Sequence, residues 1–427
     1  MMAGTCGDTD HQRLGKNRCM DLILRNSRVA GRETEGPLDI GIQGGRIAAI
    51  RPALAADGKE IDAAGRLVGP GFIETHIHLD KSRILDRCRS DRGTLEEAIE
   101  EVAAAKRGFT AEDVHARGAK TLERAILNGT THMRTHLEVD PGIGLRGFDG
   151  ILPLVREYAW AIDLEICIFP QEGLLNNPGT DDLMMQALAA GGRVVGAAPY
   201  TDSDPHGQID RVFEMARHFD IDVDMHLDFG ADPASLDLNY VCEVTERSRY
   251  GGRVAIGHVT KLSAANPEQF AAAAHRMADA GVALTVLPST DLYLMGRHMA
   301  HSVMRGVTPA HRMLAEGVNC SLSTNNVLNP FTPFGDVSLI RAANLYANIA
   351  QVGKHDDIVA CFEMITSRSA KLLRLADHGV REGAAADLVV IDATDRAGAI
   401  AEIAQPLYGF KRGRMTFERQ PAELRRP

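Results

Sequence analysis

The chain has 427 residues, too many for one small domain but enough for a (β/α)8 barrel with an accessory domain. Hydrophobic residues make up 44% and charged residues 24%, which excludes disordered, collagen-like and coiled-coil classes. Forty-seven basic against 57 acidic residues give a net charge of −10, which argues against nucleic acid or an anionic membrane as a partner. No apolar run reaches the roughly 18 residues that a membrane helix needs.

The amino-terminal segment and the cysteines indicate where the protein works. Residues 1–18 are polar and lack an apolar core, so the sequence predicts a disordered leader and no secretory signal. The seven cysteines are scattered, odd in number and without a CxxC pair, which favours buried free thiols over a disulfide framework. We therefore expect a cytoplasmic protein.

Both ends of the chain read as short strands joined by tight turns. The strand-like segments are 22–29, 38–42 and 46–50 near the amino end, and 386–391 and 408–417 near the carboxyl end. Gly44-Gly45 predicts a two-residue hairpin turn. Because isolated hairpins cannot bury a core, we expect residues 19–70 and 376–420 to form one β-sandwich domain.

Residues 71–375 alternate between strand-like and helix-like segments. The helical patterns cover 95–106, 111–127, 183–190, 208–219 and 267–280. Eight strand candidates end near His78, His136, Gln171, Tyr200, His226, His258, Ser289 and Asn325. Alternating buried strands and helices build parallel βα units, and eight of them predict an α/β fold with a closed (β/α)8 TIM barrel. An open doubly wound sheet is the alternative, but no GxGxxG follows the first strand.

Histidines are concentrated at the predicted strand ends, where barrel enzymes place their catalytic residues. His76 and His78 lie two residues apart on one strand, so both point into the barrel mouth. His226 and His258 end later strands. A pair of polar strand residues without a metal is the alternative, but the convergence favours one divalent ion, zinc or iron, on His76, His78 and His226.

Several motifs carry a resemblance to a known family. They are the run PGFIETHIHLDK at 70–81, MRTHL at 133–137, FPQEG at 169–173, HLD at 226–228, GH at 257–258 and NPFTPFG at 329–335. In these motifs the chain resembles the amidohydrolase superfamily, within the branch of cytosine deaminase and N-isopropylammelide isopropylaminohydrolase. The resemblance covers residues 22 to 417 and implies a metal-bearing barrel with a small β-sandwich.

The resemblance also implies roles for single residues. His76, His78 and His226 match the family's histidine ligands, and His258 matches the histidine beside the metal-bound water and the reacting group. Gln171 matches the glutamine that hydrogen-bonds the amide-like edge of a pyrimidine, for which a primary amide offers both a donor and an acceptor. A loop-capping role for Gln171 is the alternative.

Two positions depart from the family pattern. Asn325 stands where the family has an aspartate that binds the metal and takes a proton, and Phe229 stands where it has a proton-shuttling glutamate. Ordinary cytosine deamination is therefore doubtful. A neutral fourth ligand leaves the metal its full charge, which favours hydroxide formation with less help from a base. Phe229 and Asn326, which follows Asn325, are assigned to the substrate pocket.

The remaining proton transfer falls to His258 and Asp228, although Asp228 fits equally well as a residue that orients His226. Asp80 has the same two interpretations, proton transfer or orientation of a ligand histidine. Glu138, Asp202 and Asp204 also follow predicted strands, but their spacing does not select among them. Lys81 either meets an anionic substrate or pairs with Asp80, and we favour the ion pair.

The sequence thus predicts a metal-dependent hydrolase of a carbon–nitrogen bond, a deaminase or related amidohydrolase that acts on a small planar N-heterocycle. One alternative is hydrolysis of a ring amide or of another leaving group. A second alternative is a non-catalytic ligand-binding protein that keeps the fold. We expect the protein to form a homo-oligomer. We also expect its binding partner to be a small-molecule substrate.

Overall fold

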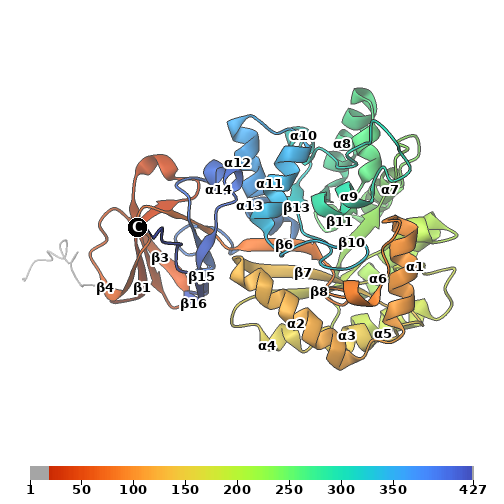
Figure 1. The fold of residues 1–427 in the computed structure, drawn as a ribbon, viewed down its shortest axis with the longest axis horizontal. Helices are drawn as coiled ribbons and strands as arrows, with labels where there is room; N and C mark the ends of the chain where they lie inside the picture. The colour runs from red at the N-terminus through yellow and green to blue at the C-terminus, as the bar shows by residue number, and fades with distance from the viewer. Residues whose placement is uncertain (1–18, 426–427) are drawn as a thin grey trace, which may run out of the picture.

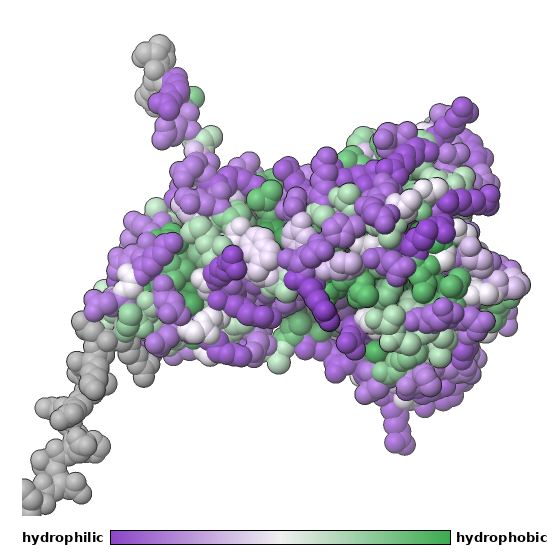
Figure 2. Space-filling model, turned by 90° about the horizontal axis from the view of Figure 1, so that it is seen from below, coloured by the Kyte–Doolittle hydropathy of each residue, from purple (hydrophilic) through white to green (hydrophobic). Residues whose placement is uncertain are grey.

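The computed structural model describes residues 19–425, so the predicted leader 1–18 lies outside the described residues. Figure 1 shows two parts, a β-domain built from the first and last strands and a larger barrel with surrounding helices. The face in Figure 2 is mostly hydrophilic, with scattered hydrophobic patches. Within residues 19–425, no helix is long and apolar enough to cross a membrane.

The strands form two sheets of eight. The β-domain contains β1 Cys19–Val29, β2 Leu38–Gln43, β3 Arg46–Arg51, β4 Asp57–Asp62, β5 Leu67–Pro70, β14 Leu388–Ile391, β15 Pro406–Lys411 and β16 Arg414–Glu418. The barrel contains β6 Phe72–Ile77, β7 Thr130–Glu138, β8 Asp163–Phe169, β9 Val194–Val195, β10 Asp222–Leu227, β11 Val254–His258, β12 Val282–Val286 and β13 Cys320–Leu322.

Fourteen α-helices lie in the described part of the chain. They are α1 Leu95–Lys106, α2 Ala111–Leu127, α3 Arg146–Ile151, α4 Leu154–Glu157, α5 Thr180–Ala190, α6 Pro205–Phe219, α7 Leu238–Ser248, α8 Pro267–Ala280, α9 Pro288–Leu294, α10 Ala310–Ala315, α11 Leu339–Ile349, α12 His355–Glu363, α13 Ser367–Leu372 and α14 Arg396–Ala401.

The barrel strands pair in chain order, all parallel, which confirms the predicted (β/α)8 fold. Closure between the first and last strands rests on a short bridge. The backbone N–H of Asn325 donates to the carbonyl of His76, and the N–H of His78 donates to the carbonyl of Asn325, both at 3.0 Å. Barrel closure therefore places Asn325 directly beside the HxH pair.

The fourth barrel strand differs most from the prediction. A strand ending near Tyr200 was expected, but β9 is only Val194–Val195, and a 3-10 helix follows at Pro199–Thr201. Gly196 and Pro199 explain the early end, because glycine weakens a strand and proline has no N–H to donate. Helix α6 begins earlier than predicted because Asp204 caps it and Pro205 fits its first turn.

The β-domain is assembled from both chain ends. Its core packs Leu24 and Ile40 from the amino end against Leu388, Val390 and Phe410 from the carboxyl end, all with 0% exposure. The predicted turn joins β2 to β3, and its two glycines have φ values of 58° and 75°, which few other residues adopt. Because β14 pairs with β5, the sheet continues across the two ends.

Candidate active site

Three histidine side chains meet at the mouth of the barrel. The Nε2 atom of His226, on β10, lies 3.0 Å from Nε2 of His76 and 3.1 Å from Nε2 of His78. All three residues are buried. His226 thus lies close to both of the other predicted ligands, whereas the group whose ring nitrogens all lie within 4.8 Å of one another consists of His76, His226 and His258.

Neighbouring groups fix the orientation of these rings. His78 Nδ1 lies 3.1 Å from the backbone carbonyl of His136. A carbonyl only accepts, so Nδ1 carries the proton and Nε2 keeps its lone pair towards the cluster. The His226 ring stacks on Phe169 with centroids 4.6 Å apart. Gly257 gives His76 room, because a Cβ atom there would lie 3.2 Å from the His76 ring.

His258, at the end of β11, belongs to the same cluster and has a carboxylate partner. One of its ring nitrogens lies within 4.8 Å of nitrogens of His76 and His226. Its Nδ1 lies 2.5 Å from Oδ1 of Asp291, a fully buried residue of α9. His258 has a φ of 70°, a left-handed conformation that is uncommon outside glycine and often found at functional sites.

A second set of charged groups lies beneath the metal-ligand candidates. Asp224 Oδ1 is 3.5 Å from His136 Nε2 and 3.9 Å from His76 Nδ1, and its Oδ2 accepts from Arg134 at 2.8 Å. The His136 ring stacks on His76 at 3.7 Å. Asp224 Oδ1, His76 Nδ1 and His136 Nε2 are all buried without a hydrogen-bond partner among the described residues, so this carboxylate lies near the cluster but does not bond to it.

The two asparagines after β13 differ in their surroundings. Asn325 has a φ of 63°, and both polar atoms of its buried amide lack a hydrogen-bond partner among the described residues. Asn326 accepts through Oδ1 from Asn329 Nδ2 at 2.8 Å, and the same Nδ2 donates to the Lys81 carbonyl. Asn325 therefore has an amide oxygen available for a cation, whereas Asn326 is held by its loop.

A narrow cavity opens above these groups. Its wall includes the predicted pocket residues Gln171, Phe229 and Asn326, together with His258 and Lys81. The Phe229 ring lies edge-on to His258 at 5.3 Å. The cavity volume is only about 10 Å³, against about 580 Å³ for the groove that Tyr293 and Phe334 line. The cavity therefore has no room for a large ligand.

The acidic candidates lie apart from the histidine nitrogens. Asp228 accepts from the backbone N–H groups of Asp237 and Leu238 at 2.9 Å and from Lys261 at 3.0 Å, so both of its oxygens are engaged. Asp80 accepts from the backbone of Lys81 and Glu138. The expected ion pair between Lys81 and Asp80 is wrong: Lys81 pairs with Glu138 instead, at 2.5 Å.

Two further acidic candidates support loops. Asp202 accepts from the backbone of Leu174 and Leu175, and Asp204 caps α6 through the N–H of Gly207. These contacts give both residues a role in supporting loops.

Four groups of three potential ligands occur in residues 19–425, and two of them already hold an ammonium ion. Lys411 Nζ lies 2.8 Å from both Asp163 and Asp387 in the group with His132. Lys106 Nζ lies 2.5 Å from Asp140 in the group with Glu138 and Glu172. The other two groups share His76 at the barrel mouth. The barrel mouth is therefore the strongest candidate for a metal centre.

The protonation of the cluster fits a metal. Burial lowers the pKa of His76, His78 and His226 well below 6.5, and the positive charge of neighbouring rings or of Lys81 lowers it further. The rings are therefore neutral near pH 7, and the neutral imidazole is the form that binds metals.

Sequence reasoning gave no role to Asp224, Arg134 and Asp291. Asp224 lies two residues before His226 on the same strand, and side chains two residues apart lie on one face of a strand. This spacing could have predicted that Asp224 lies near the histidine cluster. Asp291 lies on α9, 33 residues after His258, and no local pattern links the two. Their contact depends on how α9 packs over the barrel mouth.

Comparison with known proteins agrees with this site. The model of the amidohydrolase family matches residues 59–152 and 164–417. N-isopropylammelide isopropyl amidohydrolase of Pseudomonas sp. strain ADP is 28% identical over 404 residues, 92% of this chain and 96% of the relative. Pterin deaminase of Rhizobium rhizogenes is 29% identical over 373 residues, 85% of this chain and 84% of the relative.

Among solved structures, 5-methylcytosine deaminase from Klebsiella pneumoniae with 5-fluorocytosine superimposes with a TM-score of 0.90 at 28% identity. The match covers 95% of this chain and 99% of the solved one. The expected branch and the expected enzyme class, an amidohydrolase acting on carbon–nitrogen bonds other than peptide bonds, are confirmed at this level. The chain belongs to the amidohydrolase family.

Proposed function

We propose that this protein is a metal-dependent hydrolase that breaks a carbon–nitrogen bond of a small planar N-heterocycle. The observation that carries the proposal is the convergence of the Nε2 atoms of His76, His78 and His226 beside the unpartnered amide of Asn325. Relatives named for N-isopropylammelide, pterin and 5-methylcytosine support a heterocyclic substrate.

One divalent ion, zinc or iron, would be held by His76, His78 and His226, with the Asn325 amide oxygen as a fourth ligand. Imidazole nitrogens suit both metals, and a neutral amide oxygen is a weak ligand that does not offset the charge of the ion. When bound, the ion supplies Lewis acidity and lowers the pKa of water towards neutrality. Asp224 lies below His76, with Oδ1 3.9 Å from Nδ1.

The protein's own groups then handle binding and protons. His258 lies beside His76 and His226 and takes the proton from the attacking water. Asp291 holds the His258 ring in place. The Phe229 ring and the Gln171 amide line the cavity, the ring offering an apolar face and the amide a polar edge. Asp228 supports the loop before α7, and this position makes it the weaker of the two catalytic candidates.

The departures from the family pattern at Asn325 and Phe229 determine which reactions the site could catalyse well. Neither side chain accepts a proton at neutral pH, so ordinary cytosine deamination should be slow. A ring with a better leaving group, or hydrolysis of a ring amide, needs less proton transfer. A binding protein without turnover is the competing function, favoured by the same two losses.

Metal content and turnover test the proposal together. The expected result is one equivalent of zinc or iron in the purified protein, lost in His76→Ala, His78→Ala and His226→Ala. His132→Ala is the matched control, because His132 lies in a ligand group that Lys411 fills. A wild-type protein without stoichiometric metal after mild loading contradicts the metal site.

Turnover on a panel of amino- and alkylamino-substituted heterocycles separates an enzyme from a binder. An enzyme releases the amine, whereas a binder shows only thermal stabilisation by the ring. The cytoplasmic location and the homo-oligomer stay predictions, which cell fractionation and light scattering would test.

A further inference from the structure

We propose that Glu74 is a positioning residue that holds Asn325 in place through Thr324 and so sets how tightly the barrel mouth binds its ion. This inference rests on the proposed function, in which Asn325 is the fourth ligand. It concerns a buried carboxylate outside the set of ligand candidates, to which the sequence patterns assign no role.

Glu74 lies where the first barrel strand is irregular. It belongs to β6, two residues before His76, and is 0% exposed. Glu74 pairs with Met133 of β7, whereas the next pair joins Ile77 to Thr135, so three steps along β6 match two along β7. Such a bulge bends the strand and re-aims its side chains. His76 lies within this bulge, directly after the position of Glu74.

The carboxylate of Glu74 reaches across the barrel closure to the segment after β13. Its Oε2 accepts from the Thr324 hydroxyl at 2.6 Å, and its oxygens accept from the backbone N–H of Thr324 at 3.2 Å. It also accepts from the backbone N–H of His76 at 3.3 Å. One side chain thus bonds both to the strand that carries His76 and to the residue before Asn325.

Asn325 has a backbone conformation that needs support from its surroundings. Its φ of 63° lies in the left-handed region, which asparagine adopts more readily than most residues but which is still uncommon. Its amide makes no hydrogen bond within the described part of the chain, so its own side chain does not fix the turn. The turn therefore depends on its neighbours and on the barrel-closing backbone bonds.

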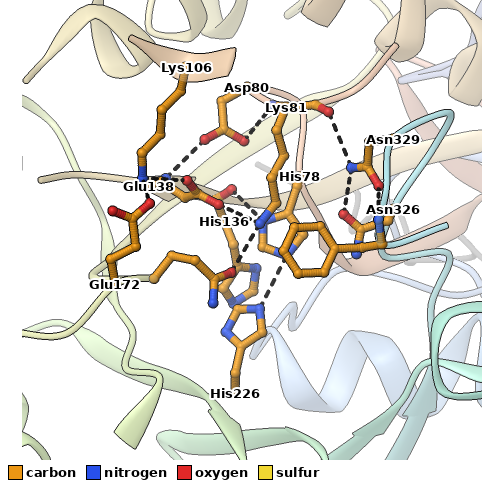
Figure 3. Close-up of polar contacts among 12 residues, drawn as sticks. His78, Asp80, Lys81, Lys106, His136, Glu138, Glu172, His226, Asn326 and Asn329 are labelled. Carbon is orange, nitrogen blue, oxygen red and sulfur yellow. Dashed lines mark hydrogen bonds and ion pairs between the residues drawn. The ribbon is translucent and has the colours of Figure 1, made fainter. Parts of the chain in front are cut away.

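The residues on both sides of Asn325 are anchored. Thr324 is bonded to Glu74. Asn326 accepts from Asn329, as Figure 3 shows. Asn326 also lines the cavity, whereas Glu74 does not. A change at Glu74 can therefore alter the position of Asn325 without removing a contact with a substrate.

A carboxylate suits this position because it only accepts. Thr324 offers it two donors and His76 a third. A glutamine of the same shape would turn its NH2 group towards one of these donors, and an unpaired buried donor is costly. Burial raises the pKa of Glu74 to about 7, although the hydrogen bonds from Thr324 lower it. The measurements below are therefore set at pH 8, where the ionised form prevails.

The expected effect of this contact is on metal affinity. Groups that hold metal ligands in position typically contribute about 10- to 100-fold to the affinity for the ion. Without the Glu74 contact the turn at Asn325 could shift, and the amide oxygen would no longer be preorganised for the ion.

Co2+ is the probe, because divalent first-row metals bind nitrogen and oxygen ligands and its visible absorption reports the number and geometry of those ligands. Competition with a chelator on the full chain measures the affinity. We expect Glu74→Gln to bind Co2+ about 10- to 100-fold more weakly than the wild type and to change the visible spectrum. Thr324→Val breaks only the hydroxyl contact and should weaken binding about 3- to 10-fold.

Thr285→Val is the matched control for Thr324→Val. Thr285 is also buried, on β12, and its hydroxyl lies 3.0 Å from the Ser321 hydroxyl. The control removes a hydroxyl contact of the same kind from the same barrel, but its partner is Ser321 and not Glu74. It should lower the melting temperature about as much as Thr324→Val and keep the wild-type Co2+ affinity and spectrum.

A double variant shows whether Glu74 acts through Asn325. Asn325→Ala removes the fourth ligand, so it should weaken Co2+ binding and change the spectrum in the same direction as Glu74→Gln. In the Asn325→Ala background, Glu74→Gln should weaken binding at most about twofold further, because its effect has already been lost.

The outcomes separate this inference from the function on which it rests. Wild-type affinity and spectrum in Glu74→Gln, an equal loss in Thr285→Val, or unchanged Co2+ binding in Asn325→Ala overturns the inference and leaves the three-histidine site intact. If Glu74→Gln does not fold, the comparison of Thr324→Val with Thr285→Val decides. A wild-type protein that binds neither Co2+ nor zinc nor iron overturns the inference and the proposed function together.

Discussion

His258 Nδ1 lies 2.5 Å from Oδ1 of Asp291, and the other oxygen of this buried carboxylate accepts from the backbone N–H of Leu287 at 3.3 Å. Because a carboxylate oxygen accepts, the contact places the proton of His258 on Nδ1. The same arrangement of carboxylate, imidazole and reacting group operates in serine proteases. If His258 is the base, as proposed above, Asp291 would support it and so supply part of the role that Asn325 and Phe229 cannot fill.

Asp291→Asn tests this positioning role. The amide has the same shape but lacks the charge that stabilises a protonated His258, so turnover should fall by about 10²- to 10⁴-fold. Metal content and the melting temperature should change little. Asp228→Asn is the comparison: loss of activity there, with Asp291→Asn active, would assign the base to Asp228.

Glu138 gives a prediction for stability against pH. Burial raises its pKa, but Lys81 and Lys106 outweigh that effect and lower the pKa from 4.5 to about 2. A lowered pKa means that the folded state holds fewer protons than the unfolded state, so the stabilisation is present above pH 4.5 and is lost as the pH falls towards 2.

Urea unfolding of the wild type and of Glu138→Gln measures this effect. The variant should be about 3 kcal/mol less stable near neutral pH, the usual cost of breaking a buried ion pair, because Lys81 and Lys106 lose a charged partner. The difference should shrink as the pH falls below 4.5. A difference that stays constant across this range would show that Glu138 is not an ionised partner of the two lysines.

Much of the fold could be predicted from local sequence signals. The prediction was wrong where those signals were weak. Helix α8 begins and ends as expected because Asn266 forms a capping box with Gln269 and Gly281 ends it with a positive φ. Strand β9 has only two residues among glycine, alanine and proline, so no alternation marks its end. Its length is fixed by pairing with β8 and β10.

The candidate site was predictable to the extent that its residues share a strand or a motif. His76 and His78 follow from their spacing, and Asn325 follows from its place in the family pattern. The partner of Lys81 did not follow, because Asp80 is adjacent in sequence whereas Glu138 is 57 residues away and reaches Lys81 only across paired strands. Ion pairs of this kind depend on which barrel strands lie side by side, and amino-acid composition does not reveal that.

Removal of residues 380–427 tests the composite β-domain. The deletion takes Leu388, Val390 and Phe410 from the core that they share with β1 and β2, so the amino-terminal strands should lose their packing. We expect strong binding of a hydrophobic dye and a lower melting temperature. Deletion of residues 421–427 alone is the control, because residues 421–425 are exposed coil. An unchanged melting curve in the larger deletion would contradict the shared core.

The two departures from the family pattern can be reversed together. Asn325 lies beside the HxH pair through the barrel-closing backbone bonds, and Phe229 lies 5.3 Å from His258, so an aspartate and a glutamate at these positions would both face the cavity. Asn325→Asp restores a proton acceptor, and Phe229→Glu restores a shuttle to the ring nitrogen.

Each group typically contributes about 10²- to 10⁴-fold when it acts in acid–base catalysis, so the wild type should turn over cytosine very slowly. We expect the double variant to gain more cytosine deamination than the product of the two single gains, because a base without a shuttle leaves one proton transfer unassisted. Turnover of the four proteins at matched metal content measures this coupling. Rapid cytosine deamination by the unmodified protein would overturn the argument, because it would show that Asn325 and Phe229 cost the reaction little and that His258 with Asp291 suffices.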